Sequence, residues 1–367
     1  GKAGGFLARH WGDGQVTEQL HKQGFDLHKE LAKELGLSTW REITTLSVQR
    51  EAWSAPKTNQ FAKWIGGEGT EETPGVRLMD TRTAQVTPME ITNALMEGAI
   101  DQGAELVIGK VVGIDTDDGD DDDKKGDGDA SRVTGVLLED GRKIKAGKVI
   151  VAMGPWSTKV EDWLNIRIPM TGIYSTSLVY TAEKNEKAKE MILNEPRALF
   201  CSEDSHDSHL EVYPRSNGDV YICGCGGSRY ITEQELRNYQ PAPGTEVADD
   251  RRALAAFESF NSLAPSITQG RKPDVTQACM RPCPPDALPM IGPLPGVDGA
   301  YIAAGHNCWG ILWGPVTGKI MSELVLDGKS SIDLKHFNPK RFGGKLASPV
   351  AGGRGRHRGD EQVGEQW

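Results

Sequence analysis

The sequence lacks several features that would assign the chain to a narrow class. It contains no run of about 20 apolar residues, so no membrane-spanning helix is expected. None of the six cysteines shows the paired C-x-x-C spacing of a zinc site, so no metal centre is predicted. Basic residues form no stripe with interleaved aromatics, and a nucleic-acid partner is therefore not expected. What remains is a globular chain of 367 residues, long enough for about two domains, whose number of subunits the sequence does not indicate.

Negative charge is concentrated in one segment. Residues 115–129 contain nine Asp and two Lys, so they account for −7 of the net charge of −10. Such a run of like charges cannot bury apolar surface, and we interpret residues 115–130 as an acidic disordered loop. The cysteines are expected to be reduced thiols, which is typical of a cytoplasmic protein.

A phosphate-binding fingerprint is also absent. The pattern G-x-G-x-x-G cradles a pyrophosphate at the start of a helix. Gly224 and Gly226 begin such a pattern, but Arg229 stands where the last glycine belongs. Either no dinucleotide binds, or the strand, turn and helix that carry the fingerprint are missing. A chain that begins with Gly1 instead of Met favours the second interpretation.

The most informative segment lies near the C-terminus, at residues 279–324. Between residues 299 and 318 it has five glycines and no charged side chain apart from a protonatable His306. Its pattern predicts a strand, a glycine turn and a helix. Glycines let the main chain approach a flat ligand closely, and a turn that opens a helix presents free N–H groups and the positive end of the helix dipole. The segment is therefore predicted to bind a ligand that carries negative charge.

Local patterns elsewhere predict a mixed α/β fold. Helices are expected at residues 17–35, 87–103 and 248–263, and from the glycine turn to Gly328. In the second of these, Thr87 and Glu90 have the spacing of a capping box. Strands are expected at residues 105–114, 132–138, 148–152, 171–181 and 299–304, and a hairpin at residues 209–224 that turns at Asn217-Gly218.

Several motifs taken together resemble one known family. Arg281-Pro282, the segment AAGHNCWGI at residues 303–311, the hairpin VYPRSNG at residues 212–218 and VAMGPWS at residues 151–157 occur in family order and with suitable spacing. The family is the FAD-dependent D-amino-acid oxidase superfamily, which includes glycine oxidase and sarcosine oxidase. The resemblance covers residues 1–337. The opening GKAGGFLA is similar to the fungal and plant FAD oxidoreductases of this superfamily, in which it follows the second Rossmann strand.

The resemblance implies a fold and a division into domains. The expected fold class is α/β (α+β), with an FAD-binding Rossmann-like domain that lacks its first βαβ segment and an antiparallel β-sheet substrate domain. Residues 1–37 and 86–165 would belong to the FAD-binding domain, residues 38–85 and 166–278 to the substrate domain, and residues 279–337 to the FAD-binding domain again. Residues 338–367 are expected to form a disordered tail.

The resemblance also implies a cofactor and a reaction. The cofactor is FAD, for which non-covalent binding is favoured, although Cys279 aligns with the cysteine that carries covalent flavin in sarcosine oxidases. The reaction is the oxidation of a C–N bond of a small amine or amino acid by hydride transfer to the flavin, with oxygen as acceptor. The residues assigned to the cofactor are Lys2, Ala3, Gly4, Gly5, Phe6, Val111, Val112, Ala152, Gly154, Trp156, Cys279, Gly305, His306, Asn307, Cys308, Trp309, Gly310, Ile311 and Leu312.

Four residues are candidates for the catalytic site. Arg281 would bind a substrate carboxylate because its guanidinium pairs with both oxygens, and a structural salt bridge is the alternative. Glu211 stands where the family has an aromatic residue, and it either accepts a cationic amine or lies on a solvated strand face. The same two interpretations, a site residue or a residue on a solvated strand face, apply to Tyr213. His306 either contacts the flavin or is hydrogen-bonded within a packed turn.

Cys308 stands where glycine oxidase has an arginine, which leaves a second interpretation open. The chain could keep the fold and FAD yet act, with little or no activity, as an interaction or trafficking component. By resemblance alone, a peripheral association with endosomes would fit that interpretation. A nicotinamide dehydrogenase is disfavoured because its fingerprint is absent and nothing else supports it.

Overall fold

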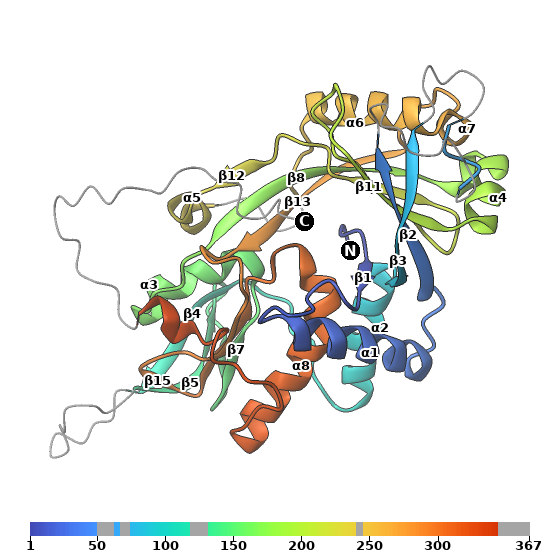
Figure 1. Ribbon diagram of the computed structural model, residues 1–367. Helices are drawn as coiled ribbons and strands as arrows, with labels where there is room; N and C mark the ends of the chain where they lie inside the picture. The colour runs from blue at the N-terminus through green and yellow to red at the C-terminus, as the bar shows by residue number, and fades with distance from the viewer. Residues whose placement is uncertain (50–61, 67–73, 118–130, 240–244, 344–367) are drawn as a thin grey trace, which may run out of the picture.

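The computed structural model describes residues 1–49, 62–66, 74–117, 131–239 and 245–343. Strands of these residues form three sheets, and helices pack around them, so the predicted α/β class is confirmed. In Figure 1 the largest sheet crosses the upper half of the molecule, with α6 (Asp250–Leu263) above it. In the lower half, α1 (Glu18–Glu34) lies beside α8 (Gly310–Asp327).

The largest sheet joins segments from almost the whole length of the chain. Its order is β1 (Phe6–Ala8), β3 (Gly75–Gln85), β2 (Arg41–Gln49), β9 (Arg197–Cys201), β10 (Glu211–Pro214), β11 (Val220–Cys223), β8 (Thr171–Tyr180) and β12 (Arg229–Ile231), while β13 (Val275–Cys283) also pairs with β8. All pairings are antiparallel except that of β2 with β9. This sheet contains the predicted hairpin, and Leu210 and Val212 pack into the core under α6.

Two smaller sheets lie below the first one. One has the order β14 (Met290–Pro293), β16 (Ala300–Ala304) and β7 (Val149–Val151), and β16 is parallel to β7. The other joins β15 (Val297–Asp298), β5 (Ser131–Leu138) and β4 (Val111–Asp117), with β6 (Lys143–Lys145) beside β5. The parallel pair brings together the two predicted strands at residues 148–152 and 299–304, which lie about 150 residues apart in the sequence.

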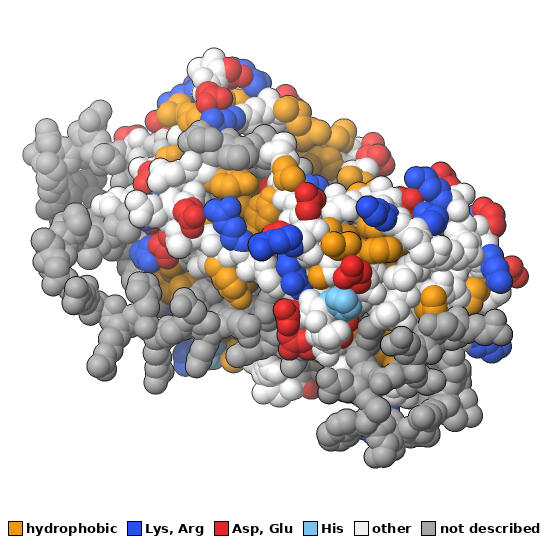
Figure 2. All heavy atoms as spheres, turned by 90° about the horizontal axis from the view of Figure 1, so that it is seen from above, with side chains coloured by type: hydrophobic (Ala, Val, Ile, Leu, Met, Phe, Trp, Pro, Cys, Tyr) orange, Lys and Arg blue, Asp and Glu red, His pale blue; other side chains and the backbone are white. Residues whose placement is uncertain are grey.

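The remaining helices are shorter or lie at the surface. They are α2 (Pro88–Asp101), α3 (Val160–Leu164), α4 (Glu186–Asn194), α5 (Glu233–Asn238) and α7 (Pro265–Thr268), with 3₁₀ turns η1 (Gly154–Lys159), η2 (Ala182–Lys184), η3 (Asn307–Trp309) and η4 (Pro339–Phe342). Figure 2 shows the molecule from above, where acidic and basic side chains are interspersed with hydrophobic ones.

Close packing of α1 against α8 depends on Gly24. A Cβ atom placed on Gly24 would lie 2.4 Å from the carbonyl oxygen of Leu312, so the two helices touch backbone to backbone. One turn further on, His28 Nε2 lies 2.8 Å from the Ile311 carbonyl oxygen. The buried face of α1 therefore runs through Leu20, Gly24 and His28, whereas Leu27 and Leu31, which belong to the predicted apolar spacing, are only partly buried.

The predicted capping box at the start of α2 is wrong. Thr87 makes no side-chain cap, and the Glu90 carboxylate instead accepts hydrogen bonds from the backbone N–H and hydroxyl groups of Ser38 and Thr39. A partner distant in sequence has replaced the local one. Ile91 is buried but Leu95 is 39% exposed, so the apolar face of α2 is only partly covered by the described residues.

Three boundaries also differ from the sequence-based expectations. The strand predicted from residue 105 begins only at Val111. Residues 115–117 of the expected acidic loop belong to β4, where Asp115 accepts a hydrogen bond from Thr134 and pairs with Lys143; residues 118–130 lie outside the described residues. Within the expected tail, residues 339–342 form η4, and residues 344–367 lie outside the described residues. The division into domains remains a prediction.

Candidate active site

A cavity of about 720 Å³ lies between the N-terminal segment, the large sheet and η3. Most of the predicted site residues meet in its wall. They are Lys2, Ala3, Gly4, Gly5, Phe6, Trp156, Glu211, Tyr213, Cys279, Arg281, Asn307, Cys308, Trp309, Gly310 and Ile311. The cavity therefore combines chain segments that lie at opposite ends of the sequence.

The other predicted residues lie elsewhere. Ala152 and His306 line a second, smaller cavity beside α8, which Gly310 borders as well. Gly154 begins η1, Gly305 precedes the η3 turn, and Leu312 is fully buried in α8. Val111 and Val112 belong to β4 in a separate sheet, and neither contributes to the wall of the larger cavity. Their expected role at the adenine end of the cofactor stays a prediction.

Two glycines let the N-terminal segment lie flat against the sheet. A Cβ atom on Gly4 would come within 2.6 Å of the Tyr213 ring. Gly5 has a φ of +84°, and a Cβ there would lie 1.9 Å from the Val86 carbonyl oxygen. The next residue, Phe6, stacks on Tyr213 with ring centroids 5.3 Å apart. The segment is thus fixed across the base of the cavity.

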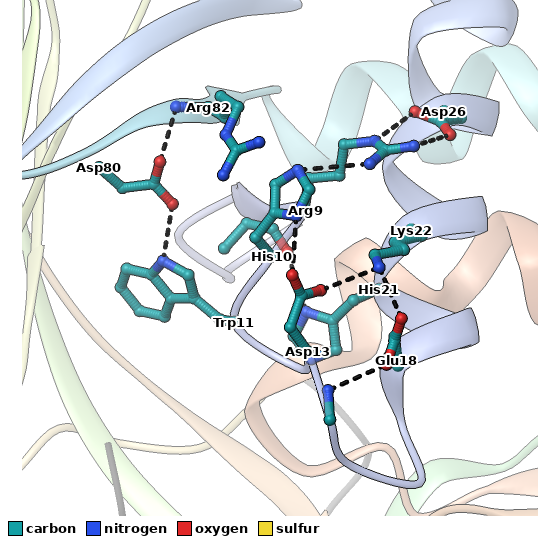
Figure 3. Close-up of polar contacts among 12 residues, drawn as sticks. Arg9, His10, Trp11, Asp13, Glu18, His21, Lys22, Asp26, Asp80 and Arg82 are labelled. Carbon is teal, nitrogen blue, oxygen red and sulfur yellow. Dashed lines mark hydrogen bonds and ion pairs between the residues drawn. The ribbon is translucent and has the colours of Figure 1, made fainter.

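The loop between β1 and α1 is held by hydrogen bonds and ion pairs to α1 and β3 (Figure 3). The Trp11 indole N–H donates to Asp80 at 3.0 Å, and its ring meets the Trp309 ring edge-on at a centroid distance of 6.0 Å. Arg9 donates to both oxygens of the Asp26 carboxylate, from Nε at 2.8 Å and from Nη2 at 2.7 Å. This loop therefore joins the first strand to α1 and positions an aromatic ring against the η3 turn.

The η3 turn places polar groups at the beginning of α8. Asn307 has a φ of +50°, a left-handed conformation that Asn tolerates, and its buried Oδ1 has no hydrogen-bond partner within the described part of the chain. Gly310 and Ile311 begin α8, where backbone N–H groups lack helical partners. An orphaned polar atom beside a helix N-terminus in a cavity wall fits a ligand with polar and anionic groups.

His306 is held inside this turn and does not face the larger cavity. Its Nε2 lies 3.0 Å from the Thr317 hydroxyl oxygen. Burial lowers the pKa of His306 to about 4, so the ring is neutral at physiological pH. This arrangement favours the packed-turn alternative over direct flavin contact.

Arg281 and Glu211 bring opposite charges to the same cavity. Arg281 projects from β13, where its Nη2 donates to the Ser175 hydroxyl at 3.4 Å. Burial opposes its charge, yet Cys308 and Glu211 hold its pKa above the usual value. Glu211 is only 6% exposed, so the solvated-face interpretation of this residue is wrong. The Tyr213 hydroxyl donates a hydrogen bond to Glu211, and the Cys223 thiol donates another at 3.5 Å.

The sequence patterns did not single out three polar residues of this wall. Ser175 contacts Arg281, Cys223 contacts Glu211, and Glu246 pairs with Lys2 at 3.7 Å. The alternation of Ser175 and Ser177 within β8 is a period-two signal that could have identified the first. Nothing in the local sequence of Cys223 separates a small buried hydrophobe from a thiol that donates a hydrogen bond to a cavity acid.

The chemistry of the wall fits a flavin. Backbone glycines and the rings of Trp309 and Phe6 offer flat surfaces, and the η3 turn with the start of α8 offers N–H groups for a ring that becomes negatively charged when reduced. In the described ranges, no group of three or more His, Cys, Asp or Glu side chains could ligate a metal ion. None of the helices formed by the described residues is both long enough and apolar enough to cross a membrane.

Comparisons with known proteins agree with this description. Residues 1–324 match the family described as FAD dependent oxidoreductase. A Schizosaccharomyces pombe protein named as a candidate oxidoreductase, C1F5.03c, is 29% identical over 349 residues, which cover 91% of this chain and 85% of the yeast protein. Glycine oxidase of Pseudomonas aeruginosa is 26% identical over 211 residues, but the match covers 58% of this chain and 50% of that enzyme.

Solved structures have the same fold. Glycine oxidase from Geobacillus kaustophilus superposes with a TM-score of 0.68 at 18% identity, covering 92% of this chain and 87% of the other. L-amino acid deaminase from Proteus vulgaris superposes with a TM-score of 0.71 at 15% identity, covering 93% and 88% of the two chains. At these identities the likeness concerns the fold alone.

Proposed function

The chain belongs to the FAD-dependent oxidoreductase family, and we propose that it oxidises the C–N bond of a small amino acid or related amine. The observation that carries this proposal is the position of Arg281, whose guanidinium lies in the wall of the same cavity as the η3 turn and the start of α8. The larger cavity therefore contains both a positive charge that can bind a substrate, on Arg281, and a polar, glycine-rich turn that can bind a cofactor, at η3.

Bound FAD would accept a hydride from the carbon that carries the amine. The residues of the cavity wall that would hold the flavin are Asn307, Cys308, Trp309, Gly310 and Ile311 together with the N-terminal residues Lys2, Ala3, Gly4, Gly5 and Phe6. Within this arrangement the α8 N-terminus stabilises negative charge by its free N–H groups and the helix dipole. Oxygen is the acceptor that we propose for the reduced cofactor.

Arg281 would bind the substrate carboxylate. Its guanidinium can donate two parallel hydrogen bonds to the two carboxylate oxygens, an arrangement that fixes orientation as well as charge. The Ser175 hydroxyl supports the side chain from β8. Glycine oxidase and L-amino acid deaminase, which share the fold, are named for amino-acid substrates, and this supports the same substrate class here.

We propose non-covalent FAD. Cys279 lines the cavity, but burial raises the pKa of its thiol, which keeps the sulfur protonated and poorly nucleophilic. Acid precipitation of the flavoprotein tests this directly. Flavin that remains in the supernatant supports non-covalent binding, whereas flavin in the pellet indicates a link to Cys279.

A second candidate function rests on Cys308 and on the acid at position 211. Burial raises the pKa of Cys308 to about 12, so a neutral thiol stands where glycine oxidase has an arginine. A flavoprotein of this fold with an altered cavity could serve as an interaction component. We also propose a cytoplasmic location, where reduced cysteines are the usual state.

Product analysis separates the two candidates. The holoprotein is incubated with single amino acids and with the corresponding amines that lack the carboxylate. The proposed enzyme forms ammonia and the matching 2-oxo acid, consumes oxygen, and loses most of this activity when the carboxylate is absent. A protein that binds FAD but forms neither product with any of these compounds would support the interaction component.

A further inference from the structure

The two oxygens of Glu211 differ in their surroundings. Both the Tyr213 hydroxyl and the Cys223 thiol donate to Oε2. No hydrogen bond from the described residues reaches Oε1, although Glu211 lines the cavity. A carboxylate oxygen that borders a cavity and accepts no hydrogen bond from the protein can accept one from a ligand with an N–H donor. One oxygen is therefore held in place, and the other is available to the cavity.

Glu211 and Arg281 do not neutralise each other by contact. Their charges interact across the cavity, yet no ion pair joins them among the described residues. Both side chains line one enclosure and have opposite charge. An amino acid in solution also has both charges, with its carboxylate and its ammonium group on one carbon. Such a molecule would bridge the two side chains, with its carboxylate at Arg281 and its ammonium at Glu211.

We propose that Oε1 of Glu211 accepts a proton from the ammonium group of the substrate and so acts as the general base of the reaction. The inference rests on the proposed amino-acid oxidation. In this step an N–H bond of the ammonium breaks and an O–H bond forms on Oε1, while the nitrogen keeps the electron pair. The product is a neutral amine, whose lone pair can form the C=N bond as the hydride leaves the neighbouring carbon. Charge and atoms balance, and no further reactant is needed.

The groups around Glu211 suit this role. Burial raises the pKa of Glu211 above that of a free glutamate, while Tyr213, Arg281, Cys223 and His209 act in the opposite direction. Cys225 and Cys308 also lie within range of its charge, and burial keeps both thiols neutral. A base with a raised pKa accepts a proton from ammonium more readily than an exposed carboxylate does.

The test compares the holoenzyme with its Glu211→Gln and Glu211→Asp variants. The readout is the rate constant of anaerobic flavin reduction divided by the substrate Kd, measured between about pH 6 and pH 10 with the amino acid that reduces the wild type fastest. We expect Glu211→Gln to lower this value about 10²–10⁴-fold at neutral pH and to recover roughly tenfold per pH unit as free amine becomes available. Glu211→Asp keeps a carboxylate and should retain the wild-type pH profile.

A binding experiment tests the same step without turnover. The probe is 2-methylalanine, which has no hydrogen on the carbon that carries the amine and so cannot be oxidised there. Calorimetry in two buffers of different ionisation enthalpy reports the protons released on binding. The wild type should release none at neutral pH, because the ammonium proton stays on Glu211. The Glu211→Gln variant should either release about one proton per ligand or bind at least about tenfold more weakly.

The outcomes are distinguishable. Equal pH profiles and equal proton release in the wild type and Glu211→Gln would overturn the base while leaving the amino-acid oxidation intact. A holoprotein that no amino acid reduces at any pH would overturn both. Flavin content and the unfolding midpoint of each variant are measured first. If the glutamine variant does not fold, the wild-type calorimetry decides, because release of about one proton per 2-methylalanine bound would overturn the base.

Discussion

Gly5 and Val86 are joined at their backbones: the Val86 N–H donates to the Gly5 carbonyl oxygen at 2.9 Å, and a Cβ atom on Gly5 would lie 1.9 Å from the Val86 carbonyl oxygen. This contact fixes the N-terminal segment across the cavity, immediately before Phe6 stacks on Tyr213. The geometry of the whole site therefore depends on a residue that has no side chain.

Replacement of Gly5 by alanine should destabilise the fold and distort the cavity. The φ of +84° and the clash with Val86 both oppose a side chain, so we expect a loss of about 3 kcal/mol or more in the free energy of unfolding. Gly14→Ala is the matched control, because Gly14 has a φ of +75° but no atom within 4 Å of its Cβ position. Urea unfolding measures both, and an equal loss in the two variants would show that the contact with Val86 is unimportant.

The Glu90 carboxylate should stabilise the packing of residues 38–39 against α2. It accepts four hydrogen bonds there, and Glu90→Ala removes them, for which we expect a loss of about 1–2 kcal/mol. Glu97→Ala on the same helix is the control, since that side chain is exposed and makes no hydrogen bond with the described residues. Urea or guanidinium midpoints measure both losses. Equal midpoints for Glu90→Ala and Glu97→Ala would show that the hydrogen bonds from Ser38 and Thr39 to Glu90 do not stabilise the fold.

Acid should weaken the fold before its carboxylates are protonated. Burial lowers the pKa of both His28 and His306 to about 4, against an ordinary value near 6.5. Between these pH values both histidines are protonated in the unfolded chain and neutral in the folded chain. The free energy of unfolding therefore falls as the pH drops from about 6.5 to about 4. Each histidine contributes a slope of up to about 1.4 kcal/mol per pH unit. Urea midpoints across this range measure the slope, which should shrink in His28→Asn and His306→Asn; unchanged slopes would contradict the assignment.

Arg281 should determine affinity for carboxylates. Arg281→Lys keeps a positive charge but loses the paired geometry, and we expect acetate or a substrate amino acid to bind about 10- to 100-fold more weakly. Arg229→Lys is the control, because Arg229 is exposed and does not line the cavity. Flavin absorbance changes on titration report the Kd. An unchanged Kd in Arg281→Lys would show that another residue binds the carboxylate.

Long periodic segments were predictable, whereas partners distant in sequence were not. The helix of residues 18–34 and the C-terminal helix ending before Gly328 were located from apolar spacing and glycine caps. Glu90 illustrates the limit, because a capping box is a local pattern and Ser38 and Thr39 replaced it through tertiary contact. The strand expected from residue 105 likewise begins later, since apolar residues alone do not provide a pairing strand.

The candidate site was predictable in composition but only partly in geometry. Arg281 and the η3 turn were identified from motif order, and both line the larger cavity. The burial of Glu211 decided between its two interpretations. Alternation along a strand separates the two faces of a sheet, but it does not indicate which face other segments cover. His306 lies in the same motif, yet its bond to Thr317 points it away from the larger cavity.

The central claim is that this flavoprotein oxidises amino acids, and anaerobic single turnover tests it most directly. The holoprotein is mixed with an excess of each candidate amino acid in the absence of oxygen, and the absorbance of oxidised flavin is followed. We expect full bleaching by at least one amino acid and much slower bleaching by the amine that lacks its carboxylate. A protein that holds FAD and keeps its oxidised spectrum with every amino acid tested would contradict it.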